Sequence, residues 1–64
     1  MNQFEAQKQY DKAVRMHQAG KVSKAIQTYR KILKAFPDLD GVHTNLGMAL
    51  YQEGRFEHAL KSLD

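Results

Sequence analysis

The sequence contains no cysteine, no tryptophan and a single proline among its 64 residues. Without cysteine the chain forms no disulfide and offers no thiolate for metal binding or catalysis, and neither an oxidising nor a reducing compartment is favoured. No run approaches the ~18 consecutive apolar residues of a membrane span, and residues 1–5 lack the basic and apolar segments of a secretory signal. We therefore predict a soluble, cytoplasmic protein with no membrane partner.

The composition is that of one small folded domain, with 42% apolar and 27% charged residues. A domain this short buries only about 60% of the surface of its unfolded chain, so we expect marginal stability unless a partner chain adds to the core. Residues 1–35 carry eight Lys/Arg against two acidic residues, whereas residues 36–64 carry two against five. The basic half is either a solvated helix face or a patch that attracts phosphates or the acidic half of another copy.

Apolar residues recur at helical spacing along nearly the whole chain, and no window alternates with the period of two that marks strands. Gly20 and Gly54 stand where helices are expected to stop, because glycine adopts the left-handed conformation after a helix without penalty. Pro37 ends another helix, and Asp38 or Asp40 is expected to cap the one that follows. The sequence therefore predicts antiparallel helices over about 3–19, 22–36, 41–53 and 56–63.

An internal repeat links the two halves of the chain. A shift of 34 residues aligns three identical pairs, Gln18 with Gln52, Gly20 with Gly54, and Ala25 with Ala59. The same shift pairs large apolar residues, Met16 with Leu50, Ile26 with Leu60, and Tyr29 with Leu63. The pattern also predicts small residues where the helices of each hairpin cross, Ala13 against Ala25 and Gly47 against Ala59.

The second unit resembles a tetratricopeptide repeat, whose period is also 34 residues. The resemblance is carried by Leu46-Gly47-x-x-Leu50, Gly54-Arg55-Phe56 and Ala59-x-x-x-Leu63, and the first unit shows the later part of the same pattern. It implies an all-α fold of stacked antiparallel hairpins, a short solenoid. We expect a single domain over 1–64, with repeat 1 at about 6–39 and an incomplete repeat 2 at about 40–64.

The sequence offers no constellation for catalysis, so we predict no enzyme activity and no cofactor. It has no glycine-rich phosphate loop. His17, His43 and His58 are expected on three different helices, which leaves no metal site. Ser23 has no histidine at a local spacing and is expected to help open its helix. Glu53 is interpreted as a solvated charge.

A concave groove is the site that the resemblance implies. By helical phase and by similarity to the family, the groove residues are expected to be Tyr10, Val14, His17, Thr44, Met48, Tyr51 and Gln52, with Gln7 and Gln18 at the rim. Such a groove suits an apolar or amphipathic peptide segment; the alternative is that Tyr10, Val14 and Met48 merely flank the core. Asn45 matches one position of the carboxylate clamp found in some family members, but Tyr10 and Val14 replace the clamp's lysine and second asparagine, which argues against a clamp.

The function predicted from these patterns is a protein–protein interaction scaffold. In the family the first helix of each unit turns a large apolar pair toward the preceding unit, and polar Gln9 and Lys12 stand at those positions here. The resemblance therefore implies that residues 1–37 are a terminal unit, whereas the other end is expected to leave apolar surface open. The chain is therefore either part of a longer array or a homo-oligomer, expected to be a dimer, associating through what we call the leucine face: Leu46, Leu50, Leu60 and Leu63. Straightening the turn at Gly20 or Gly54 would exchange halves between copies.

Two alternatives remain open from the sequence. The first is a small binder of nucleic acid or an anionic surface through residues 21–34, where Lys24, Lys31 and Lys34 recur at helical spacing. Nucleic acid is disfavoured as a partner, because no aromatic residue interleaves with these lysines for base stacking. The second alternative is an engineered or minimal repeat with no ligand.

Overall fold

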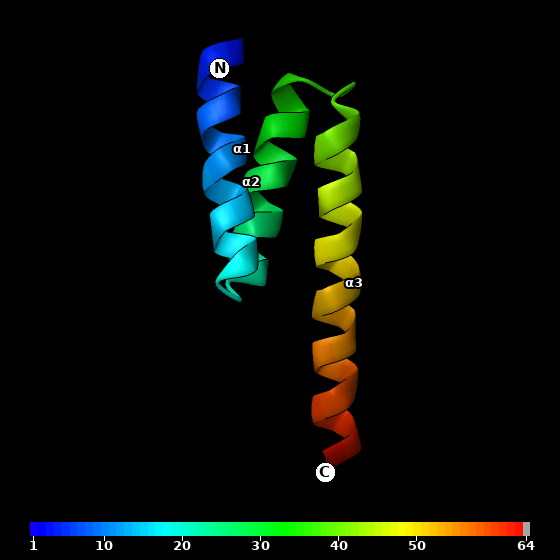
Figure 1. Ribbon diagram of the computed structural model, residues 1–64. Helices are drawn as coiled ribbons and strands as arrows, with labels where there is room; N and C mark the ends of the chain where they lie inside the picture. The colour runs from blue at the N-terminus through cyan, green and yellow to red at the C-terminus, as the bar shows by residue number, and fades with distance from the viewer. Residues whose placement is uncertain (64) are drawn as a thin grey trace.

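The computed structural model describes residues 1–63, with side chains through residue 55, as three helices and no strand. The helices are α1 (Gln3–Gln18), α2 (Val22–Ala35) and α3 (Asp40–Leu63). Figure 1 shows α1 and α2 as an antiparallel hairpin, with α3 running antiparallel to α2 on the other side. The predicted all-α class of packed antiparallel helices is therefore confirmed.

Local hydrogen bonds explain where α1 begins and ends. The side chain of Asn2 accepts a hydrogen bond of 2.8 Å from the backbone N–H of Glu5, which satisfies a free donor of the first turn. At the other end Gly20 has φ = 85°. The N–H of Lys21 donates to the carbonyl of Met16 (2.8 Å) and that of Gly20 to His17 (3.1 Å), the pairing of a Schellman motif. The predicted glycine stop at Gly20 is confirmed.

The connection from α2 to α3 turns at the single proline. Phe36 leaves the helix with φ = −135° and ψ = 81°, the extended geometry expected before Pro37. His43 Nε2 donates to the Pro37 carbonyl at 2.7 Å and ties this loop to α3. The predicted end of α2 is correct to one residue, whereas Asp40 is the first residue of α3 rather than its cap.

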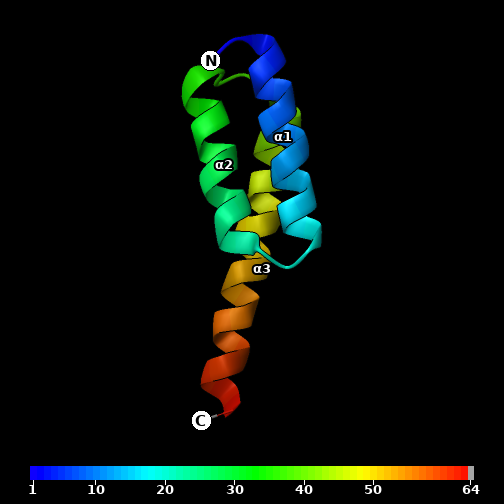
Figure 2. The ribbon, with the colours of Figure 1, turned by 90° about the vertical axis from the view of Figure 1, so that its left-hand side faces the viewer.

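The helix break predicted at Gly54 is wrong. Instead of two helices over 41–53 and 56–63, the backbone forms one helix of 24 residues, and the ribbon of α3 continues past the α1–α2 turn (Figures 1 and 2). Glycine permits a turn but does not force one, because inside a helix it costs only about 1 kcal/mol relative to alanine. Histidines 43 and 58 therefore share one helix rather than lying on two.

The continuous helix also excludes one predicted crossing within the chain. Gly47 and Ala59 are twelve residues apart on α3, which places them about 18 Å apart along the helix axis. They therefore do not face each other in the same chain. In the first hairpin the corresponding residues, Ala13 and Ala25, are both fully buried, as close helix packing requires.

The core lies on α2, between the other two helices. Tyr29 and Ile32 are its largest fully buried side chains. The other buried residues come from all three helices and are Ala6, Ala13, Val22, Ala25, Ile26, Val42 and Ala49. No helix in the described part of the chain is long and apolar enough to cross a membrane.

Candidate functional site

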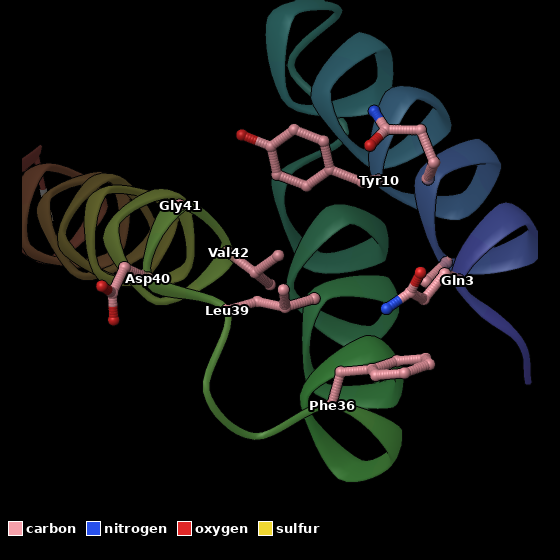
Figure 3. A pocket seen from close by; sticks show the side chains of 9 residues that line it. Gln3, Tyr10, Phe36, Leu39, Asp40, Gly41 and Val42 are labelled. Carbon is pink, nitrogen blue, oxygen red and sulfur yellow. The ribbon is translucent and has the colours of Figure 1, made fainter.

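Two cavities lie along α1 and α3, and together we call them the groove. The first cavity has a volume of about 440 Å³ and lies where the α2–α3 loop meets the beginnings of the two helices. Figure 3 shows Tyr10 of α1 directed toward Gly41 of α3, while Phe36, Leu39 and Val42 form an apolar wall. Its remaining lining residues are Gln3, Ala6, Gln7 and Asp40.

The second cavity, of about 390 Å³, lies further along the same two helices. Helix α1 contributes residues one turn apart and α3 contributes a facing set, while α2 supplies Tyr29 between them. The lining residues are Val14, His17, Gln18, Tyr29, Asn45, Met48 and Gln52. Apolar side chains and amide groups are therefore interleaved along one path, an arrangement suited to a peptide with alternating side chains and backbone polar groups.

Two hydrogen bonds bridge α1 and α3 across this groove. Asn45 Nδ2 donates to the hydroxyl of Tyr10 at 2.6 Å, and His17 Nε2 donates to Gln52 Oε1 at 2.8 Å. Tyr10 lines the first cavity and Asn45 the second, so their bond lies between the two. All four side chains are half-buried, so the two bonds link α1 directly to α3.

The hydroxyl of Tyr29 is the unusual polar group of the site. The side chain is fully buried and its oxygen has no hydrogen-bond partner among the described residues. Burial raises the pKa of Tyr29, and the neighbouring Tyr10 raises it further, so the hydroxyl keeps its proton at neutral pH. A buried hydroxyl without a partner costs about 1–3 kcal/mol.

The structure brings together most of the residues predicted to line a groove. Val14, His17, Met48 and Gln52 line the second cavity and Tyr10 the first, while the predicted rim residues Gln7 and Gln18 line the first and second respectively. Thr44 and Tyr51 lie outside both cavities; they are exposed, and the Arg55 guanidinium lies 5.0 Å from the Tyr51 ring. That these residues bind a peptide stays a prediction.

Sequence reasoning missed the wall made by Phe36 and Leu39 and the part played by Tyr29. A signal for Tyr29 was present, since it is the one hydroxyl-bearing residue in the otherwise apolar stripe of α2. Ser23 was also misassigned. Its hydroxyl donates to Glu53 Oε1 at 3.2 Å, which links α2 to α3, and the helix begins after Lys21 without a side-chain cap.

The structure describes the side chains of only two residues of the leucine face, Leu46 and Leu50. Leu46 is half-buried and packs against the core, and Leu50 is 40% exposed. Leu60 and Leu63 lie outside the residues whose side chains are described. Lys24, Lys31 and Lys34 are exposed on α2, and their role as an anionic-surface site stays a prediction. The described residues contain no cluster of three potential metal ligands.

Comparison with known protein families gives a match. The sequence profile of a tetratricopeptide repeat family matches residues 16–64. Neither the curated proteins nor the solved structures with which the chain was compared include a match.

Proposed function

Because the chain belongs to the tetratricopeptide repeat family, we propose that it is a protein–protein interaction module whose α1–α3 groove binds an extended segment of a partner protein. The groove lies where the first helices of successive repeats face each other. Its two cavities, of about 440 and 390 Å³, follow one another along the same pair of helices. A segment in extended conformation has the shape for such a path.

The apolar area that the second cavity exposes is the observation that carries this proposal. Val14 and Met48 both line that cavity, and Met48 is 58% exposed, so its area is available to a ligand. The amides of Gln18 and Gln52 line the same cavity and would orient the bound segment. The expected ligand is therefore an apolar or amphipathic peptide.

Replacing Met48 by glutamate tests the groove. Random peptides displayed on phage are selected on the native protein, and the affinity of the selected peptide is then measured by calorimetry. We expect Met48→Glu to weaken binding at least about tenfold, or roughly 1.4 kcal/mol, because a carboxylate would have to be desolvated against the peptide. Lys31→Glu, on the exposed side of α2, is the control and is expected to leave the affinity unchanged. Equal affinities for both variants would contradict the proposed site.

Self-association through the leucine face is a second candidate, favoured by the exposure of Leu50. The residue it matches in the repeat, Met16, is half-buried beside the core, whereas Leu50 is 40% exposed. A second copy covering this face would remove that apolar area from water. We expect a dimer.

Sedimentation over a concentration series tests the dimer. We expect Leu50→Lys to raise the dissociation constant at least about tenfold, because the interface would then have to bury a charge. Leu39→Lys places the same charge at a leucine of nearly equal exposure, 39%, in the α2–α3 loop, and is expected to leave the constant unchanged. A native protein that remains monomeric throughout the series would contradict self-association.

A further inference from the structure

We propose that the groove selects an extended segment with a lysine or arginine for the first cavity and, four residues away along the segment, an aliphatic residue for the second. This rests on the function proposed above and goes beyond it, because it names the two side chains that the groove holds and the spacing between them. The charges and aromatic rings of the first cavity and the distance between the cavities support it.

Asp40 gives the first cavity a negative charge. It is the first residue of α3, lines the cavity and is exposed. Gln7, which lines the same cavity from α1, donates its side-chain Nε2 to Asp11 Oδ1 at 3.1 Å, so a second carboxylate lies close by. Among the described residues, no lysine or arginine lines either cavity. A positively charged side chain of the partner is therefore attracted to this end of the groove.

The helix N-termini at this end do not make it an anion site. The side chain of Asn2 accepts a hydrogen bond from the first turn of α1. At the start of α3 the carbonyl of Leu39 accepts from the N–H groups of Val42 and His43, at 3.1 Å each. The carboxylate of Asp40 also stands at the positive end of the α3 dipole, so an anionic ligand would have to approach a like charge.

The wall of the first cavity suits the long stem of a lysine or arginine. Phe36, Leu39 and Val42 line it with apolar carbons, and Tyr10 contributes a second aromatic ring from α1 (Figure 3). The methylene groups of a basic side chain pack on such a wall while its charged end stays in water. Aromatic rings also attract a cation placed over their faces. A purely aliphatic side chain would use the wall but leave the charge of Asp40 unmatched.

The second cavity suits an uncharged aliphatic side chain. Val14 and Met48 line it, and none of the described residues that line it is acidic. A basic side chain therefore gains no partner there. An aliphatic side chain packed on Val14 and Met48 removes apolar area from water.

The helices determine how far apart the two cavities lie. Helices α1 and α3 run in the same direction, because the bonds from Tyr10 to Asn45 and from His17 to Gln52 both join residues 35 positions apart. From the first cavity to the second, the lining residues advance by about ten positions on α1 and about seven on α3, which at about 1.5 Å per residue separates the cavities by about 11–15 Å.

This distance sets the spacing of the two ligand side chains. An extended chain advances about 3.3 Å per residue, and every second side chain returns to the same face. Residues four apart therefore span about 13 Å and reach both cavities, whereas residues two apart span about 7 Å and residues six apart about 20 Å.

Peptide selection on the full chain tests both features. Random peptides displayed on phage are selected on the native protein, and those that also bind the Met48→Glu variant are discarded, so that ligands of the groove remain. We expect the remaining sequences to share a Lys or Arg and, four positions away in either chain direction, a Leu, Ile, Val or Met. Inserting or deleting one residue between these two should weaken a synthetic peptide at least about tenfold, because only one side chain then reaches its cavity.

A charge swap at Asp40 separates attraction from a structural effect. We expect Asp40→Lys to weaken binding of the selected peptide at least about fivefold. The same peptide with glutamate in place of its basic residue should bind this variant more tightly than it binds the native protein. Asp40→Asn, which keeps the shape of the side chain, is expected to give a smaller loss and repeats the test if Asp40→Lys fails to fold by circular dichroism.

Asp38→Lys is the matched control. Asp38 is exposed in the α2–α3 loop and lines neither cavity, so the same change of charge there should alter the affinity less than about twofold at physiological salt. Equal effects of the two lysine variants, groove peptides without a basic residue, or a spacing other than four overturn this inference and leave peptide binding standing. If no peptide is selected, or if all bind Met48→Glu equally well, the proposed function fails and the inference with it.

Discussion

Replacing Ile32 by alanine is expected to lower the free energy of unfolding by about 2–5 kcal/mol. Ile32 is fully buried on α2, in the core shared with Ala6 of α1 and Val42 of α3. Its removal therefore leaves a cavity between all three helices. A chain of 64 residues is expected to have only about 3–10 kcal/mol of stability in total, so the variant should lose a large share of it and, at the low end of that range, unfold. Urea titration followed by far-UV circular dichroism measures the loss.

Leu39→Ala provides the control for this experiment. Leu39 is also a branched aliphatic residue, but it is 39% exposed in the α2–α3 loop, so its truncation should cost about 1 kcal/mol or less. Both variants are compared with the native chain at one protein concentration, because association would add to the apparent stability. A loss for Ile32→Ala as small as that for Leu39→Ala would contradict the docking of α3 on α2.

Features determined by residues close in sequence were predictable. The end of α1 needs only Gly20 and the carbonyls of the preceding turn, and the end of α2 needs only the steric effect of Pro37 on Phe36. The buried stripe of α2 follows from helical spacing, since a helix packed on two neighbours needs apolar residues over most of its circumference. These signals placed α1, α2 and the start of α3 within one residue of the structure.

The course of the chain at Gly54 was not predictable from the same signals. Gly20-Lys21-Val22 and Gly54-Arg55-Phe56 have nearly the same local pattern, yet the first ends a helix and the second lies inside one. The difference in energy between a straight helix and a hairpin at glycine depends on what the following segment packs against. That contact is made with residues distant in the sequence or with another chain, so a local sequence pattern does not predict it.

The sequence predicted which faces of the helices form the candidate site, but not all of the residues and hydrogen bonds in it. Helical phase placed Val14, His17, Met48 and Gln52 on facing sides of two helices, and all four line one cavity. It placed Tyr51 there as well, because phase alone does not set the rotation of α3 to within one residue. The bond from Asn45 to Tyr10 and the burial of the Tyr29 hydroxyl depend on the distance between α1 and α3, which only the packed structure supplies.

Substituting alanine at Gly20 and at Gly54 is expected to change stability in opposite directions. At Gly20, φ = 85° places an alanine in the left-handed region, so Gly20→Ala should lower the free energy of unfolding by about 1–2 kcal/mol. Gly54 lies in a helix, where alanine restricts the unfolded chain and favours the folded backbone, so Gly54→Ala should raise it by about 0.5–1 kcal/mol.

The two substitutions form a matched pair, because the added methyl group has room at both sites. A Cβ atom built on either glycine meets no atom within 4 Å, so backbone conformation alone separates the two results. Urea titrations of both variants at one protein concentration give the comparison. If α3 instead broke at Gly54 with a left-handed residue, as the repeat pattern predicts, Gly54→Ala would be as destabilising as Gly20→Ala. The sign of that one change therefore reports whether the chain continues straight or turns back at this residue.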